Sequence, residues 1–335
     1  MKKIKSTLLI ILLITLVIIP QTGCGNEEPI SKTNYCLDTI CQIDIYGMGE
    51  EEADAIIQEA FDLCGHYEDL LSKTVKGSDI YKVNHAKGQA VKVDEDTVQV
   101  LKKGLHYSAL YEGKFDITVG RLTDLWDFHA EEPKLPKEAD VADAVKHVNY
   151  RDVVIDGNTV KLLDPEMEID LGGIAKGFIC DKVSALMEEK GVTSGVVNLG
   201  GNIATIGLKN GRDPFKVGIE RPYSDRTEIV GYVETENKTL VTSGVYERCF
   251  TIDGKTYHHI LDIKTGYPAK SDIESVTIIA DLGKSVDCDG LSTLCLTLGV
   301  KEATKLIESI DGVEAVFIDG DDNITTTKGA NFVEK

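Results

Sequence analysis

Apolar residues recur along this chain with two different periods, and the periods separate expected helices from expected strands. Residues 50–71 carry apolar side chains three or four positions apart, which predicts an amphipathic helix. Residues 95–111 repeat that pattern. The same spacing predicts three later helices: one from the Asp170 turn to Gly191, one near 285–298 and one near 301–309.

Alternation of apolar and polar residues predicts strands, the first at 39–46. Residues 153–155 and 160–163 flank Asp156-Gly157, which is a hairpin signal. The segment after Gly113 is expected to be irregular, with the sole tryptophan, Trp126, in a loop. Further strands are expected at 196–199, 215–219, 229–233, 275–280 and 315–318.

Helices and strands alternate without a regular βαβ repeat, which favours an α+β fold of mixed sheets with helices over a doubly wound sheet. The chain has no internal repeat and no Pro/Ser-rich linker. About 300 residues of this kind can bury an ample core, so we expect one large domain or two closely joined lobes.

The first residues form an export signal. Three lysines within the first five residues precede an apolar run from Leu8 to Ile19, and Gly23-Cys24 follows. This pattern predicts a bacterial lipoprotein signal at 1–23, a lipid on Cys24, a tether at 24–33 and a domain at 34–335 outside the cytoplasm, anchored to the cell membrane. Gln21 replaces the usual leucine of that pattern, so ordinary secretion and an uncleaved anchor stay open as alternatives.

Charge and cysteines exclude several classes of function. The chain has a net charge of −20, and removing the three signal lysines makes it −23, with no Lys/Arg cluster. We therefore expect no nucleic-acid partner. The seven cysteines after Cys24 show no repeating framework, no Cys-x-x-Cys and no His-Glu-x-x-His occurs, and buried free thiols are expected.

Residues 169–177 (Ile-Asp-Leu-Gly-Gly-Ile-Ala-Lys-Gly) place an acid, two glycines and a lysine where an apolar run becomes a helix. Glycines let the backbone approach a ligand, and the start of a helix offers unpaired N–H groups and a positive dipole end to an anion. Lys176 adds a mobile cation. On its own, the turn is equally consistent with a structural strand-to-helix corner.

Asp289 and Thr293 share a helix face opposite Leu291, Leu294 and Leu298. A carboxylate and a hydroxyl at this spacing supply two oxygen ligands to a hard cation that also takes phosphate oxygens, as Mg²⁺ prefers. Taken alone, such a pair more often serves helix capping or solvation.

Other strings are ambiguous singly: 198–202 (Asn-Leu-Gly-Gly-Asn) resembles a tight turn, and His258-His259 resembles a pair of strand histidines. Their order, with Thr-Ser-Gly-Val-Tyr-Glu-Arg at 242–248, carries more weight. Together with residues 113–126 and 169–181, these strings resemble the ApbE family of FAD:protein FMN transferases, over nearly the whole mature chain.

That resemblance implies an ApbE-like fold and a set of site residues. The implied FAD contacts are Leu37, Lys114, Phe115, Asp116, Asp170, Lys176 and Ile260. The implied Mg²⁺ ligands are the carbonyl of Gly173, the carboxylate of Asp289 and the hydroxyl of Thr293. Leu37-Asp38-Thr39 departs from the family's Met-Gly-Thr, and Ile263 replaces a proline.

The implied activity is Mg²⁺-dependent transfer of FMN from FAD to a Thr or Ser hydroxyl of an extracytoplasmic acceptor protein, with release of AMP. His259 is the candidate base for the acceptor hydroxyl. Two alternatives remain: the same site could hydrolyse FAD to FMN and AMP, or the protein could be a flavin-binding lipoprotein without turnover.

Overall fold

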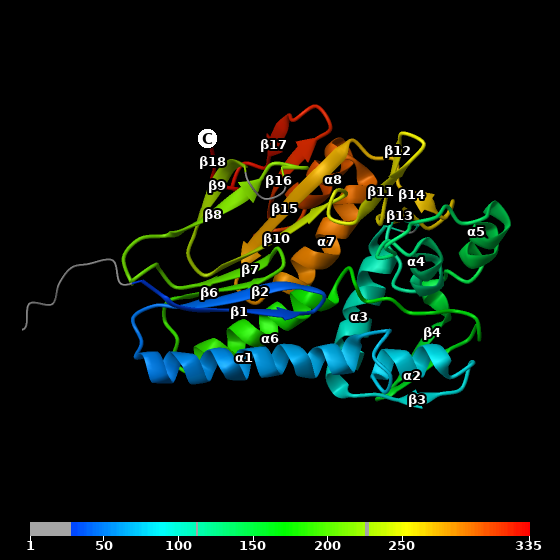
Figure 1. Ribbon diagram of the computed structural model, residues 1–335, viewed down its shortest axis with the longest axis horizontal. Helices are drawn as coiled ribbons and strands as arrows, with labels where there is room; N and C mark the ends of the chain where they lie inside the picture. Colours follow the sequence, from blue (N-terminus) through cyan, green and yellow to red (C-terminus); the bar gives the residue numbers. More distant parts are fainter. Residues whose placement is uncertain (1–27, 112, 225–227) are drawn as a thin grey trace, which may run out of the picture.

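An eight-stranded sheet forms the centre of the computed structural model, which describes residues 28–111, 113–224 and 228–335 (Figure 1). All neighbouring strands in this sheet are antiparallel. Cys24 and the expected signal peptide lie outside the described residues. In spatial order the strands are β1 (Ile30–Cys36), β2 (Thr39–Ile45), β6 (Gly195–Leu199), β7 (Asn202–Ile206), β10 (Lys238–Gly244), β15 (Ile273–Asp281), β16 (Glu314–Asp319) and β17 (Ile324–Thr326).

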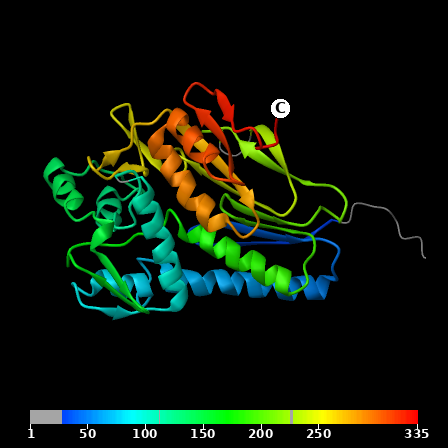
Figure 2. The same cartoon turned by 180° about the vertical axis from the view of Figure 1, so that it is seen from behind.

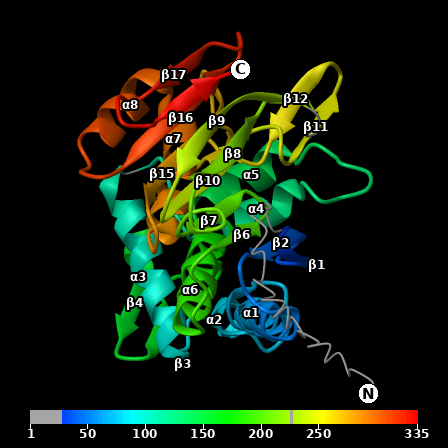
Figure 3. The same ribbon diagram turned by 90° about the vertical axis from the view of Figure 1, so that its left-hand side faces the viewer.

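Helices cover one face of this sheet, and a small sheet covers part of the other (Figures 2 and 3). Alternation along the strands decides which side chains meet which layer. In β15, Val276 and Ile278 join the helix-side core, whereas Ile279 faces the small sheet. The covering helices are α1 (Glu50–Leu71), α6 (Ala175–Glu189), α7 (Ser285–Leu298) and α8 (Val300–Glu308). The small sheet consists of β8 (Phe215–Glu220), β9 (Ile229–Thr235) and β18 (Phe332–Glu334).

The remaining elements extend one end of the molecule. A three-stranded sheet there is joined to several helices and two hairpins (Figure 1). The helices are α2 (Asp79–His85), α3 (Glu95–Leu110), α4 (Gly120–Trp126), α5 (Glu138–Val145) and the 3-10 turn η1 (Tyr150–Asp152). The strands are β3 (Val91–Lys92), β4 (Val153–Asp156) and β5 (Thr159–Leu162), with hairpins β11 (Cys249–Ile252) to β12 (Lys255–His258) and β13 (Leu261–Asp262) to β14 (Tyr267–Pro268).

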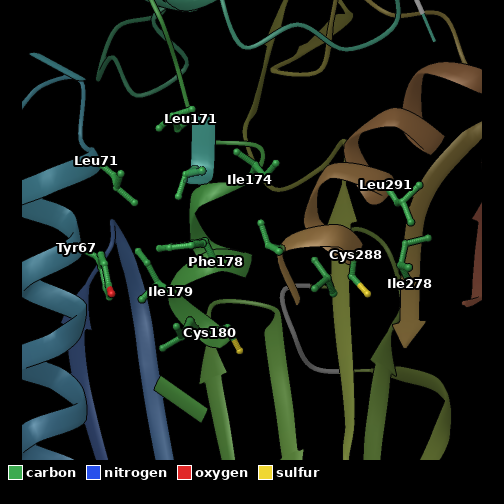
Figure 4. Close-up of a cluster of buried hydrophobic side chains, with 14 of the residues drawn as sticks. Tyr67, Leu71, Leu171, Ile174, Phe178, Ile179, Cys180, Ile278, Cys288 and Leu291 are labelled. Carbon is green, nitrogen blue, oxygen red and sulfur yellow. The ribbon is translucent and has the colours of Figure 1, made fainter. Parts of the chain in front are cut away.

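One main hydrophobic core runs through both parts of the chain. Figure 4 shows its centre, where Tyr67 of α1, Phe178 of α6 and Leu291 of α7 lie between the helices and the sheet. Val160 and Leu162 of the three-stranded sheet belong to the same core. The two parts therefore share one buried interior.

The structure confirms the α+β class and most of the expected elements, and it contains further elements that were not expected, among them α2, α5, β7 and β10. Two expectations differ from the structure. β1 begins at Ile30, inside the segment expected to be a tether, because it pairs with β2 through a two-residue turn. Leu37 and Asp38 of that turn have φ values of 55° and 60°, as a type I′ turn requires. Trp126 ends helix α4 instead of lying in a loop.

The cysteines agree with the expectation from the sequence. The seven cysteines among the described residues are all free, and five of them are buried. Among the described helices, none combines the length and the apolar character needed to cross a membrane.

Candidate active site

The glycine turn places Gly173 against helix α7. A Cβ atom on Gly173 would lie 3.1 Å from Thr293 Oγ1 and 3.3 Å from Phe115 Cε2. The backbone of Gly173, the hydroxyl of Thr293 and the ring of Phe115 therefore meet at one point. These three expected site residues come from segments far apart in the sequence.

Helices α6 and α7 touch at Gly177. A Cβ atom there would lie 2.3 Å from the carbonyl oxygen of Ser285 and 2.7 Å from Cβ of Asp289. Only glycine permits this approach. The Gly177 N–H donates to Asp289 Oδ2 at 2.8 Å, so the first turn of α6 holds the carboxylate on α7.

Asp289 is a buried carboxylate whose neighbours only partly offset the cost of burying its charge. Its exposed fraction is 3%. Burial raises the pKa of Asp289 to about 6, although the charge of Lys176 and the Gly177 N–H oppose that shift. Helix α7 is buried along most of its length, and Asp289 is among its buried residues.

Lys176 provides a cation with no fixed partner. Within the described ranges it makes no hydrogen bond or ion pair. Its charge lowers the pKa of Asp289, against the effect of burial, so its ammonium group lies within electrostatic range of that carboxylate. An unpaired, half-buried lysine beside a buried acid is suited to hold an anionic ligand.

The donor set fits Mg²⁺ that is completed by a phosphate ligand. Asp289, Thr293 and the backbone of Gly173 offer a carboxylate, a hydroxyl and a carbonyl, which are hard oxygen donors. No group of three or more His, Cys, Asp or Glu side chains suited to a metal occurs in the described part of the chain. Since the protein supplies so few charged ligands, such an ion would depend on oxygens of the substrate.

Asp170 lies on the other side of the glycine turn. Its Oδ1 accepts from the Gly172 N–H at 2.8 Å, and its Oδ2 accepts from Thr123 Oγ1 at 2.7 Å and lies 3.1 Å from Lys73 Nζ. Burial works to raise the pKa of Asp170, but the charge of Lys73 and these hydrogen bonds outweigh it and lower the pKa. Asp170 therefore stays ionised.

His259 follows the β11–β12 hairpin. Its backbone N–H donates to the carbonyl oxygen of Arg248 at 3.1 Å, and its Nδ1 lies 3.2 Å from that oxygen. This contact assigns the proton to Nδ1 and leaves Nε2 as an acceptor. Burial and the Arg248 charge lower the pKa of His259 to about 3, so the ring is neutral.

The β1–β2 turn reaches the same place. Asp38 Oδ2 lies 3.9 Å from Arg248 Nη2 and 3.7 Å from His129 Nδ1. A Cβ atom on Gly200 would lie 2.4 Å from Thr39 Oγ1, so the β6–β7 turn packs on this hairpin. Leu37 therefore lies near the His259 segment, and its contact with a flavin nucleotide stays a prediction.

Asp116 and Lys114 make internal contacts. Asp116 Oδ1 accepts from the Thr118 N–H at 2.8 Å, and Oδ2 accepts from the Tyr150 N–H at 2.9 Å. Burial raises the pKa of Asp116 despite these bonds. Lys114 Nζ donates to the Thr297 carbonyl at 2.9 Å, near the end of α7. The Asp116 carboxylate therefore orders its own loop. Ile260, the residue after His259, is also buried, with 6% of its surface exposed.

Sequence reasoning assigned no role to two charged residues of this region. Arg248 is the last residue of the 242–248 string, and its place in that string could have indicated a role for it. Lys73 lay in no motif, and its contact with Asp170 joins segments 97 residues apart (170 − 73). No sequence pattern indicates that contact.

The comparisons with known proteins identify the fold as that of a flavin transferase family. The family model described as "ApbE family" matches residues 37–317. The chain belongs to the ApbE family. An FAD:protein FMN transferase from Treponema pallidum is 32% identical over 92% of this chain and 90% of its own length.

Solved structures agree with that family. The crystal structure of the ApbE protein from Thermotoga maritima superposes with a TM-score of 0.82 at 30% identity, covering 90% of this chain and 97% of that one. The flavin transferase ApbE from Vibrio cholerae gives a TM-score of 0.77 at 26% identity, covering 90% and 96%. The fold is thus shared across nearly the whole described chain.

Proposed function

We propose that this chain is an FAD:protein FMN transferase that moves FMN from FAD to a Thr or Ser hydroxyl of an extracytoplasmic protein and releases AMP. Family membership supports the transfer. One structural observation carries the proposal: Asp289 is held by the first turn of α6, the Gly173 backbone lies against Thr293, and Lys176 of the same turn has no polar partner among the described residues. That arrangement offers a divalent ion and a cation to a pyrophosphate.

The reaction exchanges one P–O bond for another. The acceptor oxygen bonds to the phosphorus of the FMN half, and the pyrophosphate bond to AMP breaks. Bound Mg²⁺, held by Asp289, Thr293 and the Gly173 carbonyl, would neutralise charge on the pyrophosphate. Lys176 and the first N–H groups of α6 would bind phosphate oxygens and hold the phosphorus in place.

His259 is proposed to take the proton of the acceptor hydroxyl. Its Nδ1–H is oriented by the Arg248 carbonyl, which leaves the Nε2 lone pair for the proton. Burial and Arg248 keep the ring neutral, so it does not need to lose a proton first. A neighbouring pyrophosphate would raise the proton affinity of His259, because anions stabilise the imidazolium.

The test uses the purified soluble part of the chain with FAD, Mg²⁺ and a candidate acceptor domain. We expect the acceptor to gain the mass of one FMN by mass spectrometry, AMP to appear in equal amount, and no gain when the acceptor Thr or Ser is changed to Ala. Release of free FMN and AMP with an unmodified acceptor would show FAD hydrolysis and overturn the transfer.

We propose that the protein is anchored outside the cytoplasm through a lipid on Cys24. Support comes from the basic start, the apolar run and Gly23-Cys24. The Cys24→Ser variant should move the protein from the membrane fraction to the soluble fraction. Identical partitioning of the variant and the unaltered chain into the soluble fraction would overturn the anchor and leave export standing.

A further inference from the structure

Lys73 is an enclosed lysine two residues after the end of helix α1. Its side chain is 17% exposed. Nζ lies 2.6 Å from Asp124 Oδ1, 2.7 Å from Thr123 Oγ1 and 3.1 Å from Asp170 Oδ2. It also donates to the Gly120 carbonyl at 3.2 Å. These contacts tie the end of α1 to helix α4 and to the glycine turn.

Asp170 passes this restraint to the glycine turn. One of its oxygens meets Lys73 and Thr123, and the other accepts the Gly172 N–H at 2.8 Å. Gly172 immediately precedes Gly173, whose backbone lies against the Thr293 hydroxyl. A continuous chain of contacts thus runs from Lys73 to the proposed magnesium ligands.

Lys73 is surrounded by more negative than positive charge. Asp124 and Asp170 contact it, and Glu168 lies close enough for the Lys73 charge to oppose the increase in its pKa. Burial and Asp124 raise the pKa of Glu168, and His85 also opposes that increase. Without the Lys73 ammonium, Asp124 and Asp170 would lose the cation they share, and their mutual repulsion would be less screened.

We infer that Lys73 is a positioning residue, which holds Asp170 and thereby fixes the Gly172-Gly173 turn against α7 in the geometry that the magnesium site needs. The inference rests on the proposed magnesium site. Lys73 itself does not touch the reacting atoms. Its effect should therefore fall mainly on Mg²⁺ affinity in the presence of FAD. The loss of FAD affinity without Mg²⁺ should be smaller, because only the implied contact of Asp170 with FAD is disturbed there.

The test compares three variants of the purified soluble part of the chain: Lys73→Met, Lys73→Arg and the control Lys82→Met. Lys82 is half-exposed on α2 and pairs with Asp79 at 3.2 Å, so its loss removes one ion-paired lysine outside the site. FAD affinity is measured with chelator, and the Mg²⁺ concentration for half-saturation is measured with FAD bound and no acceptor present. Neither measurement requires turnover.

We expect Lys73→Met to raise the Mg²⁺ half-saturation about tenfold, as loss of groups that orient metal ligands does. FAD affinity in chelator should fall less than the Mg²⁺ affinity, by about threefold or less, and Lys82→Met should match the unaltered protein in both. Lys73→Arg should recover part of the loss, because it keeps the charge but not the compact ammonium. Amide exchange at Gly172 should be faster in Lys73→Met, because its N–H bond to Asp170 is loosened.

The outcomes separate this inference from the proposed function. An unchanged Mg²⁺ half-saturation in Lys73→Met, with a normal Mg²⁺ response in the unaltered protein, would overturn the positioning role alone. An equal loss of FAD affinity with and without Mg²⁺ would also overturn it, because the effect would then be direct or general. No Mg²⁺ response in the unaltered protein would overturn the magnesium site and this inference together.

Discussion

The two sides of the site are built differently. On one side, helices α6 and α7 approach so closely that Gly177 has no room for a side chain, and Asp289 is buried between them. On the other side, His259 follows a hairpin of two four-residue strands. That hairpin rests on a small separate cluster of apolar residues, which includes Trp126 and Tyr257.

The difference indicates that the two sides of the site differ in rigidity. Parts built on long, buried helices hold their geometry, because any movement disturbs the main core. Short hairpins held by a small cluster open at lower cost. On this side Trp126 Nε1 donates to the Gly266 carbonyl at 2.8 Å. We infer a rigid side for Mg²⁺ and pyrophosphate and a more adaptable side for the acceptor.

The largest effect should come from Asp289→Asn. The amide can still accept the Gly177 N–H but removes the charge, so FMN transfer should fall about 10³-fold. Thermal stability should be equal or higher, because burial disfavours the charged carboxylate. Transfer assays over a range of Mg²⁺ concentrations, with thermal melts, measure both. Asp287→Asn on the same helix, where Asp287 pairs with Lys103, is the control. Full activity of Asp289→Asn at limiting Mg²⁺ would contradict the metal site.

His259→Asn should affect the other side. Losing a general base slows the chemical step, so transfer should fall about 10²-fold while FAD affinity changes less than about twofold. Single-turnover rates at saturating FAD and separate binding titrations measure the two quantities. The control is His66→Asn, at an exposed position of α1. Weaker FAD binding with an unchanged rate would make His259 a binding residue.

Gly177→Ala tests the rigidity of the helix contact. The new methyl group would meet the Ser285 carbonyl at 2.3 Å, so unfolding free energy should fall by about 2 kcal/mol, and Mg²⁺ affinity should fall with it. Gly65→Ala is the matched control, since a Cβ there meets nothing within 4 Å in helix α1 and should stabilise by about 0.5 kcal/mol. Denaturant titrations distinguish them. Equal stability of both variants would show that the α6–α7 contact adapts.

The smallest effect concerns the pH dependence of the free energy of unfolding. The contributions of His259 and Asp289, one on each side of the site, should change with pH in opposite directions. His259 has a pKa of about 3 against an ordinary 6.5, so its stabilising contribution is full above pH 6.5 and is lost as the pH falls. Asp289 has a pKa of about 6 against 3.8, so the folded state gains stability as the pH falls from 6 toward 3.8. The two effects partly cancel in the unaltered protein.

Variants separate the two contributions. Between pH 7 and pH 5, Asp289→Asn should lose about 1 kcal/mol more unfolding free energy than the unaltered protein, because only the opposing Asp289 contribution is gone. His259→Asn should lose about 2 kcal/mol less. Urea titrations at the two pH values provide the measurement. Parallel losses in all three proteins would show that neither group titrates as its burial indicates.

Local patterns predicted the long helices because each pattern is a direct consequence of which face is buried. The apolar spacing at 50–71 became α1 with the same bounds. α4 was missed because its seven residues carry few apolar positions, and packing of Leu122 and Trp126 in the small cluster stabilises it. β1 was missed because Ser31, Thr33 and Asn34 show no apolar alternation, and only pairing with β2 makes it a strand.

The sequence by itself determined the chemistry that is available. It carries a glycine turn that exposes backbone, a carboxylate and a hydroxyl four residues apart on one helix, and a lysine at a helix start. Spacing within one element is set by local backbone geometry, so Asp289 and Thr293 could be placed together in advance. Their burial could not, because burial depends on what packs around the helix.

Only the tertiary structure decided how these groups are combined. The contact of Gly177 with Asp289, the approach of Gly173 to Thr293 and the pairing of Lys73 with Asp170 each join residues that are far apart in the chain. Such contacts follow from the packing of whole helices and sheets, to which residues across the entire core contribute. No local pattern encodes them, and they turn separate polar groups into one site.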